Sequence, residues 1–211
     1  MFWKRLIMGL SLACGWAVLP MHAQNRQQEA WKYKVELLGD VAHGWFYHGD
    51  HILGDGLDYG GGMGIRPFSG RLNGLGFEAR TSHLSDSGSS PAISSSLDSR
   101  LIAINALYHF RSGKNVQPFV LAGIGHVKKE DSYSCTECVY MPDPVTGELV
   151  SIPQYYHSKE SKTGIVLGGG MKIALHRHLS IRPEIILADT TPGSGPNWTW
   201  FRCQIGVGVH F

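Results

Sequence analysis

The run Cys135-Thr136-Glu137-Cys138 has the sharpest chemical spacing in the chain. Two cysteines this close can form a disulfide, remain free thiols, exchange disulfides or join a metal site. A zinc site needs further ligands, and His126, His157 and Glu137 lie within reach along the chain. No second C-x-x-C and no close histidine pair accompanies them. We therefore predict a Cys135–Cys138 disulfide, with no metal and no cofactor.

Two His-x-Ser pairs are the other candidates for chemistry, His83-Leu84-Ser85 and His178-Leu179-Ser180. In an extended strand, positions i and i+2 lie on one face, so each pair could bring a base beside a nucleophile. A hydrolytic site also needs a third group that orients the base, and the sequence does not identify one. We predict that the chain is not an enzyme and has no catalytic residues.

The elements that would position these residues are strands, and the last of them, 198–211, shows the pattern most clearly. Its residues alternate between an apolar face and a mixed face of glycine, polar and charged groups, which is a period of two. The apolar face carries Phe201, Cys203, Ile205, Val207, Val209 and Phe211. The mixed face carries Trp200, Arg202, Gln204, Gly206, Gly208 and His210.

Six earlier segments show the same alternation and a seventh, 118–126, is apolar on both sides, so the sequence predicts eight strands in all. Their connections are long after the first, third, fifth and seventh strands and short after the others, as in an up-and-down barrel. The predicted long connections are 43–56, 83–98, 128–162 and 190–197. The predicted strands are 35–42, 58–66, 74–82, 101–110, 118–126, 164–175, 179–187 and 198–211.

The polar faces of these strands carry charges of both signs, and a barrel would direct them into its lumen. In an eight-stranded barrel the interior is just filled by side chains, so we predict an ion-paired network that replaces an apolar core. A conduction path is the alternative for the same residues. The predicted lumen network is Glu78, Arg80, Lys172, Arg182, Glu184 and Arg202.

The N-terminus indicates export. Lys4 and Arg5 precede an apolar run that is too short to span a membrane, and Met21-His22-Ala23 is an acceptable cleavage site. We predict a signal peptide over 1–23, a polar tail over 24–32 and a barrel domain over 33–211. Lipoprotein export with acylation of Cys14 is the alternative.

The charge balance excludes one class of partner. The chain has 19 Lys and Arg and 17 Asp and Glu. Two of the basic residues and none of the acidic ones lie in 1–23, so the exported part has no formal net charge. Nucleic acid is therefore not an expected partner, because no basic excess would attract phosphates.

Three features together favour an all-β, eight-stranded antiparallel transmembrane barrel over a soluble barrel. They are the export signal, the alternation up to a terminal aromatic residue and the polar inward faces.

The chain resembles the small outer-membrane β-barrel superfamily of Gram-negative bacteria, the OmpA-like and OmpX-like transmembrane domains. The resemblance rests on 116–125, 168–172, 179–184 and the terminal Phe211. It implies location in the cell outer membrane, contact with outer-membrane lipid and lipopolysaccharide, and a monomer. It also implies that Phe211 is the signal read by the barrel-assembly machinery.

The function expected of such a barrel is a structural or surface-interaction role through its long loops. A narrow channel or a binder of small hydrophobic molecules is the alternative, and a lipid A-modifying enzyme is less favoured. In the deacylases of this superfamily an Asn-Ala follows the His-x-Ser motif, whereas Ile181 and Arg182 stand after His178-Leu179-Ser180. Trp198, Trp200, Phe201 and Tyr108 are expected in the aromatic belts at the membrane surfaces.

Overall fold

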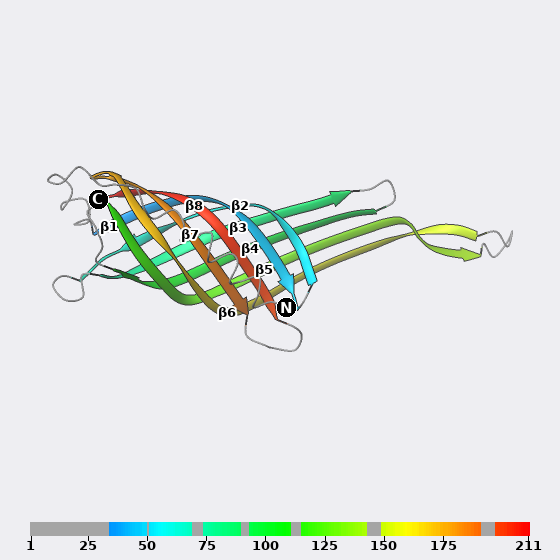
Figure 1. Ribbon diagram of the computed structural model, residues 1–211. Coiled ribbons are helices and arrows are strands. Elements are labelled where there is room, and N and C mark those ends of the chain that lie inside the picture. The colour runs from blue at the N-terminus through cyan, green and yellow to red at the C-terminus, as the bar shows by residue number, and fades with distance from the viewer. Residues whose placement is uncertain are drawn as a thin grey trace.

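The protein is a closed barrel of eight antiparallel strands in sequence order, seen in a computed structural model (Figure 1). The structure describes residues 34–49, 51–68, 74–89, 93–110, 115–142, 149–190 and 197–211, without the side chains of 88, 89, 136–140 and 150. The predicted signal peptide and the tail to residue 32 lie outside these ranges. The strands are β1 (Val35–His48), β2 (His51–Ile65), β3 (Leu75–Ser89), β4 (Ile93–His109), β5 (Val116–Pro142), β6 (Leu149–His176), β7 (Leu179–Thr190) and β8 (Trp198–His210).

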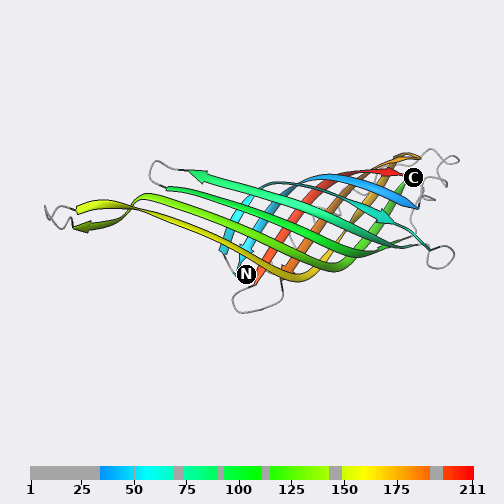
Figure 2. The same ribbon diagram turned by 180° about the vertical axis from the view of Figure 1, so that it is seen from behind.

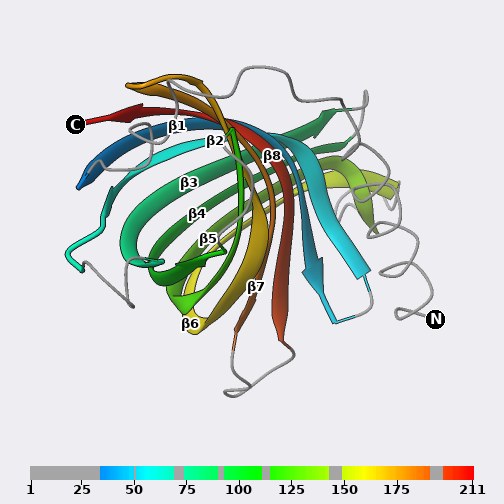
Figure 3. The same ribbon diagram turned by 60° about the vertical axis from the view of Figure 1, so that its left-hand side comes forward.

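Pairing of the first strand with the last closes the wall (Figure 3). The register runs from Glu36 opposite His210 to His48 opposite Trp198. At the chain end, the amide of Phe211 donates to the carbonyl of Val35 at 3.0 Å. Because every strand has two neighbours along the barrel wall, the backbone groups there are paired, as a membrane interior requires.

The pleat of the strands separates two kinds of surface. Along β8, residues from Phe201 to Val209 with odd numbers are half-buried or exposed, and the even-numbered residues from Trp200 to His210 are buried. The exposed set is mainly apolar and the buried set mainly polar, so the barrel is inverted relative to a soluble protein. No helix in the described ranges is long and apolar enough to cross a membrane.

Glycines allow close strand contact at a few positions. A Cβ on Gly164 of β6 would lie 2.0 Å from the carbonyl oxygen of Asp189 on β7, and one on Gly170 would lie 2.2 Å from that of Pro183. On β8, a Cβ on Gly208 would lie 2.5 Å from the Oε1 of Glu36. Glycine at Gly208 therefore leaves space for an inward-pointing side chain of the neighbouring strand.

Three of the predicted long connections are wrong in their extent. Residues 43–56 form the paired ends of β1 and β2, with the turn around Gly49, whose φ is +61°. Residues 83–98 and 128–162 are largely strand, and β5 and β6 continue pairing to Pro142 opposite Leu149. Of the predicted connection 190–197, residues 191–196 lie outside the described ranges.

These added strand lengths give the molecule its shape. The β3–β4 and β5–β6 hairpins extend past the rest of the barrel, the latter furthest (Figures 1 and 2). The turn at 177–178 and the C-terminal Phe211 lie at the opposite end. One end is therefore cut short, and the other carries a projecting sheet built from β3, β4, β5 and β6.

Candidate functional site: the barrel interior and the projecting sheet

The barrel interior holds buried charges from strands on opposite walls. Arg182 of β7 lies between two carboxylates, with Nη1 2.5 Å from Glu78 Oε2 and Nε 2.5 Å from Glu184 Oε2. Arg80 of β3 bridges the same two glutamates, with Nη2 3.1 Å from Glu78 Oε1 and Nη1 paired to Glu184. We call these four residues the Arg–Glu square. Since β3 and β7 are not neighbours in the barrel, the square ties opposite walls together.

A further ion pair extends the square toward β1. The Lys172 ammonium of β6 pairs with the carboxylate of Glu36, which also lies 3.9 Å from Arg182 Nη1. The Arg182 guanidinium lies 4.4 Å from the ring centroid of Phe119 on β5, within cation–π range. All these groups are buried, so each charge depends on its partner rather than on water.

Arg202 forms a second, separate cluster from β8. Its Nε and Nη2 atoms lie 2.6 and 2.8 Å from the two Asp58 oxygens, a bidentate arrangement. Nη2 also donates to Asp40 at 2.9 Å, and Nη1 donates to Ser82 at 2.5 Å. The structure therefore divides the six charges expected in the lumen between two clusters, with five around the square and Arg202 apart.

The sequence reasoning left Glu36, Asp40 and Asp58 out of the lumen network. The signal was present, because alternation already placed all three on the polar faces of their strands. They complement charges that would otherwise lack partners: Glu36 faces Lys172, and the two aspartates face Arg202. Counting inward charges of both signs on every strand would have found them.

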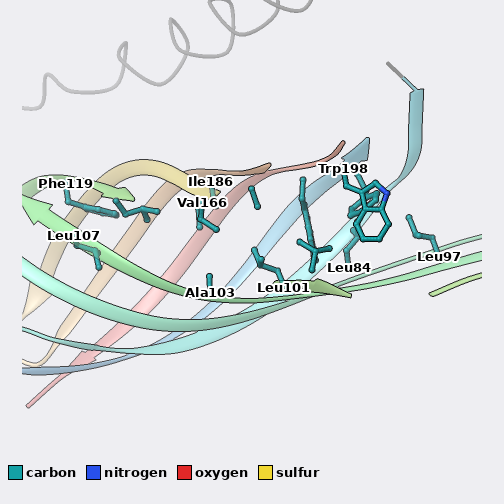
Figure 4. Close-up of a cluster of buried hydrophobic side chains, with 14 residues drawn as sticks. Leu84, Leu97, Leu101, Ala103, Leu107, Phe119, Val166, Ile186 and Trp198 are labelled. Atoms are coloured by element: carbon teal, nitrogen blue, oxygen red, sulfur yellow. The ribbon is translucent and has the colours of Figure 1, made fainter. Parts of the chain in front are cut away.

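Toward the projecting hairpins, the interior changes from ionic to aromatic. The Phe46 ring lies 6.0 Å from that of Trp198 and 5.9 Å from that of Trp200. Figure 4 shows Trp198 near Leu84 at this end of a buried apolar cluster that continues along the barrel. The Lys162 ammonium lies 4.6 Å from the Trp198 ring centroid.

The prediction that four residues lie in the aromatic belts is therefore wrong for two of the four. Trp198 and Trp200 are each 1% exposed and point into the barrel. Both have even numbers, as Arg202 does, so the pleat of β8 places all three side chains on the inward face. Phe201 and Tyr108 have outward parity, and Tyr108 is exposed.

Within the described residues, neither His-x-Ser pair has a hydrogen bond between its own histidine and serine. His83 lies 3.4 Å from Asp98, and His178 Nδ1 lies 2.9 Å from the carbonyl oxygen of His210. Buried Ser180 instead approaches Nε2 of His210 at 2.9 Å. Glu36 lies 3.3 Å from the same nitrogen. A catalytic histidine uses one nitrogen for the nucleophile and the other for the acid, so this group lacks the geometry of a triad.

The cysteine and metal predictions are only partly within the described structure. Cys135 is 1% exposed and disulfide-bonded. The side chain of Cys138 lies outside the described residues, so the pairing of the two stays a prediction. Cys203 is a free thiol on the outward face of β8. Among the described residues, no group of three or more His, Cys, Asp or Glu could hold a metal ion.

One face of the projecting sheet carries aligned hydroxyl and aromatic side chains. Ser96 of β4 lies opposite Ser132 of β5, and Ser132 lies opposite His157 of β6. Ser132 Oγ is 3.0 Å from His157 Nδ1. One row further out lie Ser94, Ser134 and Tyr155, with Ser94 Oγ 2.9 Å from Ser134 Oγ. We call these six residues the Ser/Tyr face.

The Ser/Tyr face borders a surface hollow of about 510 Å³. Tyr133 and Tyr156, which pair across β5 and β6, also line it. Tyr155 and Tyr156 are 80% and 59% exposed. Large aromatic side chains held in water on a paired sheet are available for contact with another molecule.

The model of the family "Outer membrane protein beta-barrel domain" matches residues 11–211. The chain belongs to this family. The outer-membrane location and the barrel expected from the sequence are therefore confirmed. A comparison with curated proteins found no match.

Solved structures of other outer-membrane barrels share the fold. Neisserial surface protein A has 16% identity and a TM-score of 0.59, covering 84% of this chain and 97% of its own. Ail of Yersinia pestis, solved with the heparin analogue sucrose octasulfate, has 13% identity and a TM-score of 0.52, covering 85% and 99%. The N-terminal barrel domain of Pseudomonas aeruginosa OprF has 15% identity and a TM-score of 0.50, covering 85% and 98%. At these identities the likeness concerns the fold alone.

The outward face of this outer-membrane barrel shows where the bilayer lies. Its middle carries exposed apolar side chains such as Val41, Ile104 and Ile124. Aromatic pairs border this zone, including Tyr108 with Phe110 at 5.2 Å and Trp45 with Phe201 at 5.4 Å. Phe211 is exposed at the short-turn end. Its role as an assembly signal stays a prediction.

Proposed function

We propose that this outer-membrane barrel is a surface-interaction protein, with a sealed barrel as its anchor and the projecting sheet as its binding part. The observation that carries the proposal is the Ser/Tyr face, which stands on paired strands beyond the barrel wall (Figure 2). A rigid face loses little conformational freedom when a partner binds, so the same contacts give more affinity than they would on loose loops.

The filled interior supports an anchor rather than a channel. The Arg–Glu square spans the lumen, and the aromatic residues Phe46, Trp198 and Trp200 occupy the end near the hairpins. The space beside Glu36, Arg66 and His109 measures about 10 Å³, which is room for one water molecule at most. An ion that passed this space would have to displace side chains.

The chemistry of the Ser/Tyr face favours a protein partner. Tyrosine supplies a large contact area with few torsions to fix, and serine supplies adaptable hydrogen bonds, as in antibody combining sites. The β6 edge adds to this, because within the described ranges β6 pairs with β7 only from Gly164 onward. Among the described strands, residues 149–163 therefore have a neighbour on one side only, and a partner strand could add to the other side.

The binding part is tested with bacteria that display the wild-type chain or the Tyr155→Ala variant. Adhesion to immobilised fibronectin, laminin and collagen is measured beside cells that lack the protein. We expect adhesion to at least one of these proteins by wild type and a loss of at least about tenfold in the variant, because interface hot spots, in which tyrosine is enriched, contribute about 2 kcal/mol or more each. Tyr108→Ala on the lipid-facing surface is the matched control and should adhere like wild type. Adhesion no greater than that of cells lacking the protein would contradict the proposal.

The anchor part is tested by conductance of the refolded protein in planar bilayers. Folding is first established from the difference in gel mobility between unheated and boiled samples. A folded barrel that carries no steady current supports the sealed lumen. A steady open-channel current would overturn it and favour the narrow channel.

A further inference from the structure

Two cations face each other without a counter-charge on the outer surface of the barrel. Arg100 on β4 and Lys128 on β5 are direct cross-strand partners, and both are exposed. Like charges placed opposite each other in an antiparallel pair repel and destabilise the sheet. Within the described part of the chain, neither side chain forms an ion pair or hydrogen bond. The pair therefore lacks an anion.

Neighbouring acids do not supply that anion, because they already have partners. The next row outward on the same face contains Asp98 and Glu130. Asp98 lies 3.4 Å from His83. Glu130 lies 3.0 Å from Lys159 and 3.5 Å from His157.

A hollow beside the two cations has room for an anionic group. It measures about 360 Å³ and is lined by four cations, three acids and one serine: Arg100, Lys128, Lys129, Lys159, Asp98, Glu130, Glu160 and Ser161. Asp98 and Glu130 are the acids whose partners are named above. Ser161 is the cross-strand partner of Lys128, so its hydroxyl lies in the same row as the cations. Glu160 also lines the hollow but pairs in register with Lys129, which places it on the other face of the sheet.

The surface directly below the cation pair is built to face lipid. Moving toward the short-turn end, the same face of β4 continues with Ile102 and Ile104, which are 51% and 68% exposed. On β5 and β6 the partners of Ile104 are Ile124 and Ile165, at 65% and 51%, and these three residues form an isoleucine ridge. In the row between them and the cations, Ile102 lies beside His126 and Thr163, which are 3.1 Å apart. The cations thus lie where the apolar belt ends, on the side of the projecting sheet. In an outer membrane this is the headgroup level of the outer leaflet.

We propose that Arg100 and Lys128 bind the phosphate of an outer-leaflet glycolipid headgroup, whose acyl chains lie along the isoleucine ridge. Arginine offers a planar fork of donors for phosphate oxygens, and lysine adds a point charge. A phosphate between them replaces their mutual repulsion by two attractions. The site is separate from the Ser/Tyr face, so either proposal can fail without the other.

The test uses refolded protein in detergent and native mass spectrometry with three probes. These are bisphosphorylated lipid A, its dephosphorylated form and inorganic phosphate. The test variant is Arg100→Gln/Lys128→Gln. The matched control is Lys34→Gln/Arg177→Gln, which removes two exposed cations at the other end of the barrel. Heat-dependent gel mobility establishes that each variant is folded.

We expect the wild type and the control to retain bisphosphorylated lipid A and the test variant to bind it at least about tenfold more weakly, because charge-assisted contacts are lost. The dephosphorylated lipid should bind the wild type about as weakly as bisphosphorylated lipid A binds the variant. Equal retention of lipid A by the wild type and the test variant would overturn the proposal. Inorganic phosphate that displaces lipid A at equal concentration would also overturn it, because the ridge would then contribute nothing.

A second measurement separates binding from damage to the fold. In lipid-free detergent, the test variant should unfold at the same temperature as wild type or higher, because a repulsive pair is gone. Added lipid A should raise the unfolding temperature of wild type more than that of the variant. An equal rise in both proteins would contradict a phosphate site at this pair.

Discussion

At the scale of single residues, stability depends on charges that have no contact with water. Arg182 touches Glu78 and Glu184, and Glu36 lies within 3.9 Å. Replacing it by Met keeps the bulk but leaves these carboxylates buried with less compensation. Removing one partner of a buried ion pair costs about 3–5 kcal/mol, whereas the pair itself contributes little against an apolar substitute.

We therefore expect Arg182→Met to lower the free energy of unfolding by about 3–5 kcal/mol, measured by urea titration of the barrel in liposomes. Arg177→Met, in the exposed turn between β6 and β7, is the control and should change it by less than about 0.5 kcal/mol. Equal stability of the two variants would show that water reaches the square and solvates the remaining carboxylates.

A second residue-scale prediction concerns the close approach of β6 and β7. A Cβ at Gly164 would meet the Asp189 carbonyl oxygen at 2.0 Å, and only a backbone shift can relieve this. We expect Gly164→Ala to cost about 1–3 kcal/mol in the same titration. Gly39→Ala is the matched control, since a Cβ there has nothing within 4 Å, and it should be close to neutral. A neutral Gly164→Ala would mean that the two strands separate easily.

At the scale of elements, the sequence predicted strands correctly only where a membrane gives them two different faces. From Phe201 to Val209 one face meets lipid and the other the interior, so the residues alternate. Beyond the bilayer both faces meet water, and a strand such as Ser94–Ser96 has no alternation to detect. Pairing there depends on cross-strand partners such as Ser134, which lie far away in sequence. Periodicity within one segment cannot reveal such partners.

The interior clusters follow the same logic. Parity alone places Glu78, Arg80, Arg182 and Glu184 inward, and this could be predicted. Which charge meets which depends on the barrel's closure and on the stagger of its strands. Arg202 therefore pairs with Asp40 and Asp58 rather than with the square, and no spacing along the chain could show this.

The β5–β6 hairpin tip should be dispensable for the anchor. Tyr133 and Tyr156 are direct partners, so residues 134–155 can be replaced by Asn-Gly without changing the register below them. We expect the shortened protein to keep its heat-dependent gel mobility, because the membrane part retains its pairing and its interior. The deletion removes Tyr155 and Ser134 from the Ser/Tyr face, so adhesion should fall. Loss of folding would show instead that the tip takes part in barrel formation.

At the scale of the whole molecule, one barrel combines three environments stacked along its axis. Figure 1 shows the barrel wall and the sheet that projects from it. Turns at the short end lead into the wall, which has an apolar outer surface and an ionic interior, and the wall leads into the projecting sheet. Outer-membrane barrels have short periplasmic turns and longer outer segments, so the projecting sheet should stand outside the cell. This orientation also places Arg100 and Lys128 in the outer leaflet rather than the inner one.

Single cysteines test this orientation on intact cells. In a Cys203→Ser background, we expect Tyr155→Cys to react with a membrane-impermeant maleimide, since that position is 80% exposed at the projecting end. Arg177→Cys, in the turn at the opposite end, should react only after the outer membrane is permeabilised. Wild-type Cys203 should resist the charged reagent in both conditions, because it lies on the lipid-facing side of β8. Labelling of Arg177→Cys but not of Tyr155→Cys on intact cells would show that the barrel has the opposite orientation. The Ser/Tyr face and the proposed phosphate site would then lie on the periplasmic side of the membrane, which would contradict both proposals.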